Sequence, residues 1–147
     1  MAATPGPLRL LLDTNVVVAA LLWSGPPRRL MELAFEGAAV ELFTSQALLD
    51  ELRQTLGYPR LAPRLAHHAT SVDELMAHYT ALVSLVTPAA VPRIVAGDAD
   101  DDQVIAAALA AQADLLVTGD RKHLLPLGSH QGIEIISPAD ALQRIAL

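Results

Sequence analysis

Residues 10–21 read LLLDTNVVVAAL, and this stretch decides the fold. It overlaps a short apolar run, Leu8 to Leu12, of the kind that forms a strand buried on both faces of a parallel sheet. Asp13 follows the run directly, and the apolar residues from Val16 to Leu22 predict a helix, although the three valines leave strand open as an alternative. A strand that ends at a carboxylate and leads into a helix is typical of α/β folds, in which ligands bind outside the carboxyl ends of the strands.

Alternating strand and helix patterns continue along the rest of the chain. Capping residues mark three helix starts: Ser45 before a stripe of leucines, the Ser71 to Glu74 capping box, and Ser137 before a proline. The patterns predict strands at residues 40–43, 115–118 and 133–136. They predict helices at 26–37, 45–56, 71–84, 103–113 and from 138 onward, with one helical turn at 124–126. Residues 85–95 are predicted to form a loop with room for one short strand. We therefore predict a single α/β domain over residues 1–147, with a core from about residue 8 to residue 145 and a mostly parallel sheet.

Composition and missing motifs exclude several classes of protein. The 147 residues include no cysteine, which excludes disulfides, thiolate zinc sites and a cysteine nucleophile. The apolar runs are broken well before the 18 or so residues of a membrane span, and the N-terminus lacks the pattern of a signal peptide, so we expect a soluble cytoplasmic protein with no membrane partner. Motifs for nucleotide binding and for a serine nucleophile are absent. A phosphoaspartate-transfer site would require a second Asp where this chain has Asn15.

Four carboxylates lie where such a fold would bring them together. Asp13 and Asp120 follow buried strands, Asp102 precedes the alanine-rich helix, and Glu51 borders the leucine stripe of its own helix. Converging carboxylates repel each other unless a cation lies between them, and Mg²⁺ and Mn²⁺ prefer such oxygen ligands. These four residues therefore predict a metal site.

Each acid also has a simpler explanation. Asp13 could merely cap the next helix, Asp120 suits an ordinary turn, and helix glutamates such as Glu51 are usually solvated. The run from Asp98 to Asp102 would stabilise a helix N-terminus, but one or two acids suffice for that, and four within five residues repel each other. The excess favours a cation, with Asp101 and Asp102 both left open as the ligand.

The net charge of −6 runs against a nucleic-acid partner, because phosphate binding favours a positive surface. The distribution of charge matters more than the sum. With four of the sixteen acids holding a cation, twelve would face ten bases, and nine of those ten are arginines, which suit bidentate phosphate contacts. Arg53, Arg60 and Arg64 lie in a stretch without acids and are candidate phosphate contacts, although solvated arginines on helices explain them equally well.

Together these segments resemble the PIN-domain family, and in particular its short prokaryotic members of the toxin–antitoxin (VapC-like) type. The resemblance covers residues 8–142 and consists of four segments in order: LLLDTNVVVAAL with the first acid, TSQALLDEL with the second, DADDDQVIAAALAAQADLLVTGD with the third and fourth, and EIISPADAL as the closing strand and helix. Each motif alone is modestly specific, whereas the four in order at the family's spacing are highly specific.

The resemblance implies a three-layer α/β/α fold with a central, mostly parallel sheet, and a ribonuclease that depends on Mg²⁺ or Mn²⁺. Asp13, Glu51, Asp102 and Asp120 carry over as the catalytic acids. In the implied mechanism, water attacks the phosphodiester, with Asp13 and Asp102 as direct metal ligands, Asp120 as a ligand directly or through water, and Glu51 as a ligand or water-positioning base.

The same resemblance implies further residues and partners. Asn15 and Thr118 would support the acidic pocket, and Asp101 would be an extra or water-mediated ligand. The expected substrate is single-stranded RNA, the expected assembly a homodimer, and the expected inhibitor an antitoxin protein that inserts a basic side chain among the acids and lays a helix in an apolar groove beside helices 26–37 and 45–56. The alternatives are a binding module whose main state is the inhibited complex, and a metal-binding phosphoesterase for another phosphorylated substrate.

Overall fold

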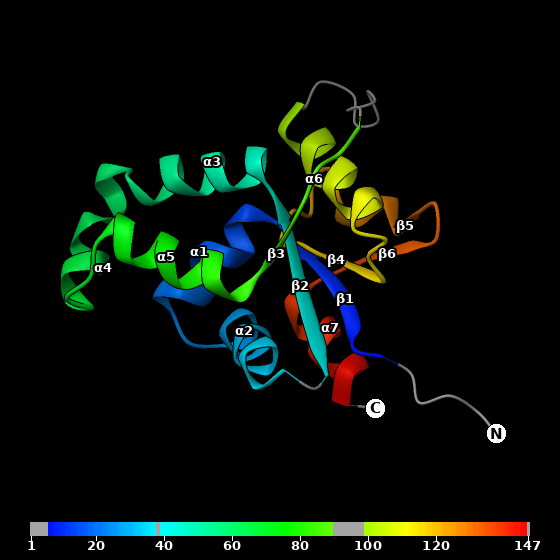
Figure 1. Cartoon of the computed structure of the whole chain (residues 1–147), viewed down its shortest axis with the longest axis horizontal. Coiled ribbons are helices and arrows are strands. Elements are labelled where there is room, and N and C mark those ends of the chain that lie inside the picture. Colours follow the sequence, from blue (N-terminus) through cyan, green and yellow to red (C-terminus); the bar gives the residue numbers. More distant parts are fainter. Residues whose placement is uncertain (1–5, 38, 90–98, 147) are drawn as a thin grey trace.

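The computed structural model describes residues 6–37, 39–89 and 99–146. Its central layer is a six-stranded sheet in the order β3-β2-β1-β4-β6-β5 (Figure 1). All neighbouring strands run parallel except β5 and β6, which form an antiparallel hairpin. The strands are β1 Leu8–Leu12, β2 Val40–Ser45, β3 Ser84–Val86, β4 Leu115–Val117, β5 Ser129–His130 and β6 Ile133–Ile136.

Helices cover both faces of this sheet. Helices α1, α2, α3, α5 and α7 contribute to the core on one face, and α6 contributes to the core on the other. The predicted three-layer α/β/α class with a mostly parallel sheet is therefore confirmed. The helical elements are α1 Thr14–Leu22, α2 Pro26–Glu36, α3 Gln46–Leu56, the 3₁₀ turn η1 Pro59–Leu61, α4 Ala62–His67, α5 Val72–Leu82, α6 Ala99–Ala110, the 3₁₀ turn η2 Leu125–Leu127, and α7 Pro138–Ala146.

β1 lies inside the sheet, between β2 and β4, and its leucines show why both faces are covered. Leu10 and Leu12 belong to the core beneath α1 and α3, whereas Leu11 belongs to the core beneath α6. Successive side chains of a strand point to opposite faces, so a continuous apolar strand requires apolar partners on both sides. None of the three leucines is more than 2% exposed, which agrees with the prediction of a doubly covered strand.

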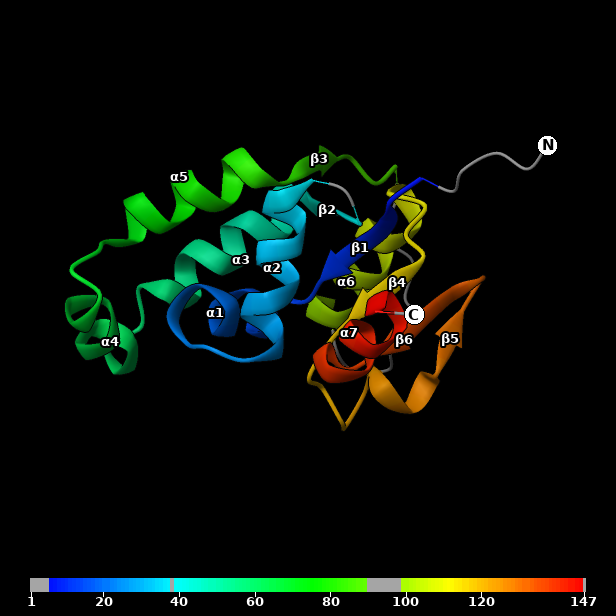
Figure 2. The ribbon, with the colours of Figure 1, turned by 90° about the horizontal axis from the view of Figure 1, so that it is seen from below.

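The segment from α3 to α5 extends to one side of the sheet, as Figures 1 and 2 both show. α3 leaves the end of β2, η1 and α4 reverse the chain at the far end, and α5 leads back to β3. Leu61 and Leu65 of the reversal are buried in the same core as α3 and α5, so the extension is packed rather than loose. We call α3, η1, α4 and α5 the helical arm.

Three predicted helix starts are confirmed by their capping bonds, whereas the helix predicted at 103–113 is α6, Ala99–Ala110, so Asp102 lies within it rather than before it. Ser45, Ser71 and Ser137 each accept, through Oγ, the backbone N–H of the residue three positions further on, at 3.2–3.3 Å. The alternative left open by the valines is decided in favour of a helix, α1, in which all three valines are buried. Burial against the sheet outweighs the small cost of β-branched residues in a helix.

Two elements were not predicted, and parts of the prediction lie outside the described residues. α4 has only six residues, too few for a helical pattern to stand out, and β5 has two polar residues. The β5–β6 turn contains Gln131 and Gly132, both at positive φ, which is the geometry of a tight hairpin turn. Of the predicted loop at 85–95, the first part belongs to β3, while residues 90–95 and Asp98 lie outside the described residues.

Within the described ranges, every helix falls short of the length and apolar character that crossing a bilayer requires.

Candidate active site

Asp13 lies where β1 ends and α1 begins. Its backbone N–H donates to the carbonyl of Val117 at 2.9 Å, which continues the pairing of β1 with β4 to the last residue. The Asp13 side chain is 6% exposed and accepts two hydrogen bonds: Oδ1 from the backbone N–H of Thr14 at 2.7 Å, and Oδ2 from the hydroxyl of Thr118 at 2.8 Å. One carboxylate oxygen therefore caps α1, and the other is oriented by the residue that follows β4.

Thr118 connects the first acid to the fourth. It follows β4 directly, is fully buried, and its hydroxyl accepts the backbone N–H of Asp120 at 3.0 Å while donating to Asp13. Its own backbone N–H donates to Ile136 of β6 at 3.0 Å. The carboxyl ends of adjacent parallel strands meet at one edge, so residues more than a hundred positions apart in the chain become neighbours.

Asp120 anchors the turn after β4. Its Oδ1 accepts the backbone N–H groups of Lys122 and His123 at 2.9 and 3.1 Å. Partial burial opposes ionisation, but these N–H groups and the nearby His123 ring outweigh it and hold the pKa of the Asp120 carboxyl below its ordinary value. Asp120 is therefore an anion under all ordinary conditions.

The acidic run enters the site through the first turn of α6. Asp101 is 8% exposed and Asp102 only 2%, so both carboxylates are withdrawn from solvent. α6 continues with buried alanines, among them Ala107 and Ala108, which let it pack closely on the sheet. Capping a helix requires no burial of two adjacent charges, which is costly, so the structure favours a function for this pair beyond capping.

His123 was not among the predicted site residues, yet it joins the acids of α6 to the turn after β4. Its Nδ1 lies 3.3 Å from Asp101 Oδ2 and 3.8 Å from Asp120 Oδ2. Among the described residues, Asp101, Asp120 and His123 offer ligating atoms that lie within 4.8 Å of one another. The signal in the sequence was the spacing Asp120-x-x-His123 in a short polar turn, a weak pattern that only the position of α6 makes meaningful.

Two predicted residues lie on helices that begin near this edge of the sheet. Glu51 is half-buried on α3, a helix that contacts both α1 and α6. Its neighbour Asp50 is exposed and accepts a hydrogen bond from Gln46 at 2.9 Å, so the distinction drawn between the two acids agrees with their burial. Asn15 is exposed in the first turn of α1, next to the buried Thr14.

The three arginines proposed as RNA contacts all lie on the helical arm. Arg53 forms an exposed ion pair with Asp73 at 2.7 Å. Arg64 is half-buried, donates from Nε to the carbonyl of Leu22 at 2.8 Å and lies over the Trp23 ring at 4.9 Å. Arg60 is exposed, with its guanidinium 5.7 Å from the centre of the Tyr58 ring. Arg64 thus has a structural task, while Arg60 is the most available of the three.

The donor set fits a hard divalent cation. Hydrogen bonds and close contacts form a continuous path from Asp13 through Thr118, Asp120 and His123 to Asp101. Carboxylates gathered and partly dehydrated in this way repel each other, and a bound Mg²⁺ or Mn²⁺ removes that repulsion. Such an arrangement suits the hydrolysis of phosphate esters.

The chain resembles known proteins both in its sequence pattern and in its fold. A family model described as PIN domain matches residues 9–122. The fold is similar to a crystal structure of VapBC2 from Rickettsia felis bound to a DNA fragment from their promoter, with a TM-score of 0.59 and 14% sequence identity, over 88% of this chain and 98% of the matched chain. At that identity the likeness shows the fold alone. No curated protein matches the chain.

Proposed function

Because this chain belongs to the PIN-domain family, we propose that it is a ribonuclease that depends on Mg²⁺ or Mn²⁺ and cuts single-stranded RNA. The observation that carries the proposal has two parts: Thr118 links Asp13 to the Asp120 turn at the carboxyl ends of β1 and β4, and Asp120 groups with Asp101 and His123. Asp102 is buried next to Asp101 on α6. Grouped carboxylates repel each other, and a bound cation would relieve that repulsion.

The proposed mechanism assigns each acid a task. Asp13 and Asp102 would hold the ion, Asp120 would hold it directly or through water, and Glu51 would hold it or orient the attacking water as a base. Thr118 keeps the Asp13 carboxylate in one orientation through its hydroxyl. A bound Mg²⁺ or Mn²⁺ supplies positive charge that favours hydroxide over water and stabilises the charge that develops on phosphate oxygens.

The proposal of RNA as the substrate rests on the family and on the exposed Arg60 of the helical arm. Unpaired strands expose their backbone and enter a narrow acidic site that a duplex does not fit. Arg60 is the arginine of the arm best placed to contact phosphate, because it is exposed and its only described partner is the weak contact with Tyr58.

The test is cleavage of a labelled single-stranded RNA by the wild type, by Asp13→Asn, and by Asp140→Asn as a control. Asp140 is an exposed acid in the first turn of α7, so its loss changes the net charge equally without touching the site. Cleavage that requires added metal, is lost in Asp13→Asn and is kept in Asp140→Asn is expected. Equal activity in all three proteins, or activity that survives EDTA, contradicts the mechanism. Hydrolysis of a small phosphate ester without RNA cleavage would favour the phosphoesterase alternative.

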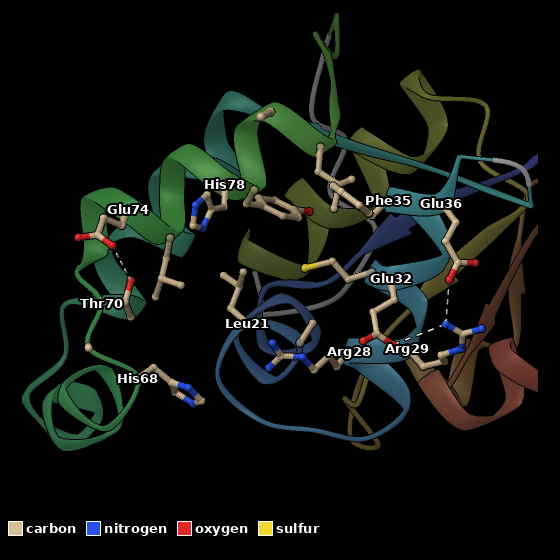
Figure 3. A pocket seen from close by; sticks show the side chains of 17 residues that line it. Leu21, Arg28, Arg29, Glu32, Phe35, Glu36, His68, Thr70, Glu74 and His78 are labelled. Carbon is tan, nitrogen blue, oxygen red and sulfur yellow. Dashed lines mark hydrogen bonds and ion pairs between the residues drawn. The ribbon is translucent and has the colours of Figure 1, made fainter.

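We also propose that the protein is the toxin of a toxin–antitoxin pair, held inhibited by a partner. The specific observation is a groove of about 850 Å³ between α2 and the α4–α5 part of the arm (Figure 3). Its wall carries apolar side chains from both sides, among them Leu21, Met31 and Leu75, and Phe35 at its edge is 83% exposed. An exposed aromatic ring beside an apolar groove is typical of a protein interface.

The charged rim of the groove indicates the kind of partner. The lining includes charged or titratable residues from both helices: Arg28, Arg29, Glu32 and Glu36 of α2, where Arg29 pairs with the two glutamates, and Glu74 and His78 of α5 (Figure 3). Charges of both signs around an apolar floor suit an amphipathic helix with mixed charges along its edges. Of the two helices predicted to form the groove, α2 lines it, whereas α3 lines a separate hollow of about 470 Å³ with α5.

This second proposal is tested with the product of an adjacent small reading frame. Purified partner is expected to inhibit the wild-type nuclease, and Phe35→Ser is expected to weaken that inhibition at least about tenfold while leaving cleavage by the free enzyme unchanged. Equal inhibition of both proteins would rule out this groove as the partner site. Light scattering of the free protein then tests the expected homodimer.

A further inference from the structure

His123 is held in place from both sides of its turn. On one side, its backbone N–H donates to Asp120 Oδ1 at 3.1 Å. On the other side, Leu124 is fully buried in the core beneath α6, and the backbone N–H of Leu125 donates to the carbonyl of Asp120 at 2.9 Å. The imidazole is therefore presented to the acids by a turn with fixed ends, with about a third of its side chain exposed.

The distances from His123 Nδ1 to the nearest oxygens of Asp101 and Asp120 are close to those between two ligand atoms of one metal ion. Two ligand atoms bound to the same Mg²⁺ or Mn²⁺ at about 2.1 Å are about 3 Å apart when adjacent and about 4.2 Å apart when opposite. The distances from Nδ1 to Asp101 Oδ2 and Asp120 Oδ2, 3.3 and 3.8 Å, fall between these limits. The ligand atoms of all three residues lie within 4.8 Å of one another, so a small movement of the chain would let one ion contact all three.

We propose that His123 is a nitrogen ligand of the catalytic ion, which it shares with Asp101 and Asp120, and that it makes the site prefer Mn²⁺ to Mg²⁺. Imidazole binds transition ions well, whereas Mg²⁺ favours a shell made wholly of oxygen. The inference rests on the proposed metal-dependent function and adds a ligand of a different chemical type to the acidic set. It also makes Asp101 a direct ligand, rather than an extra or water-mediated one.

The competing explanation is that the imidazole, when protonated, only forms ion pairs with the two carboxylates and leaves once a metal ion binds. The two explanations differ in whether nitrogen contacts the metal. Mn²⁺ is paramagnetic, so pulsed electron paramagnetic resonance detects a directly bound ¹⁴N through its modulation of the electron spin echo. This readout does not depend on RNA cleavage.

The experiment titrates Mn²⁺ into the metal-free full-length protein and compares wild type, His123→Gln and His67→Gln. His67 is an exposed histidine of α4 and serves as the matched control. The ¹⁴N modulation is expected to be present in the wild type and in His67→Gln, and to be absent in His123→Gln. Wild type grown with ¹⁵N-histidine gives the same information without a substitution, because the ¹⁴N modulation then disappears.

Affinities measured by calorimetry complete the test. His123→Gln is expected to lose at least about tenfold in affinity for Mn²⁺ and distinctly less for Mg²⁺. Mn²⁺ bound by the wild type without ¹⁴N modulation, or with modulation that persists in His123→Gln, overturns this inference and leaves the proposed nuclease intact. If His123→Gln loses equal affinity for Mn²⁺ and Mg²⁺, the proposed preference for Mn²⁺ is overturned. Failure of the wild type to bind Mn²⁺ at all overturns the inference and the proposed function together.

Discussion

The hydroxyl of Thr118 donates to Asp13 Oδ2 at 2.8 Å, and both side chains are buried although 105 residues separate them in the chain. The same hydroxyl accepts the backbone N–H of Asp120 at 3.0 Å. One side chain therefore orients the acid that ends β1 and the turn that carries the acid after β4. This relationship makes Thr118 a positioning residue for the site.

Thr118→Val keeps the shape of the side chain and removes both hydrogen bonds. Removing the hydroxyl that donates to the buried Asp13 carboxylate is expected to lower the free energy of unfolding by about 1–3 kcal/mol. Cleavage is also expected to fall, because Asp13 is no longer held in one orientation. Denaturant unfolding and RNA cleavage measure the two effects. Thr118→Ser retains the hydroxyl and is expected to stay close to wild type. A valine variant with normal activity would show that Asp13 needs no such support.

Asp102→Asn is expected to stabilise the metal-free protein. It removes one of several like charges in a confined space, which is worth about 1 kcal/mol and raises the melting temperature by a few degrees. Saturating Mn²⁺ is expected to reverse the order, because the wild type binds the ion more tightly and gains more stability from it. Thermal unfolding with EDTA and with Mn²⁺ measures both states. If the order is the same in both, the acids do not form a metal site.

The lowered pKa of Asp120 predicts how stability depends on pH in the absence of metal. A carboxyl whose pKa is lower in the folded state contributes fully above its unfolded pKa of about 3.9, and loses that contribution as the pH falls through the folded pKa. Asp120→Asn has no charge to lose. The difference in unfolding free energy between wild type and variant is therefore expected to shift against the wild type as the pH falls below about 4.

Glu51→Gln tests the acid that the sequence supported least. If Glu51 holds the ion or orients water, cleavage is expected to fall about 100-fold, with little change in stability because the residue is only half-buried. Asp50→Asn is the matched control, since Asp50 is the exposed neighbour bonded to Gln46. Similar activity for the two variants would remove Glu51 from the catalytic set.

The arginines of the arm are expected to separate by function. Arg60→Ala should weaken RNA binding without altering the melting temperature. The slope of log affinity against log salt concentration should fall by about one, because one phosphate contact is lost. Arg64→Ala should lower the melting temperature instead, because it removes the bond to the Leu22 carbonyl and the contact with Trp23. Filter binding at several salt concentrations and thermal unfolding distinguish the two. Equal effects of both variants on both measurements would contradict this division.

Local patterns were sufficient for most secondary structure. The apolar run of β1 predicted a strand covered on both faces, and the serine caps predicted where helices begin, because both signals lie within a few neighbouring residues. They were insufficient for α4 and β5, which are too short to show a period and are held by packing and by a tight turn. The valines of α1 likewise became helical because tertiary burial decided between two close propensities.

Neighbouring residues alone indicate most of the strands and helices and show that carboxylates follow two of the strands. Which of those carboxylates meet depends on how the strands and helices pack. The tertiary structure placed Thr118 on Asp13, buried Asp101 and Asp102 together, and brought His123 to the Asp101 carboxylate. The contacts at the site join β1, α6 and the turn after β4, which come together only when parallel strands pair side by side, and no local pattern in the chain records that pairing.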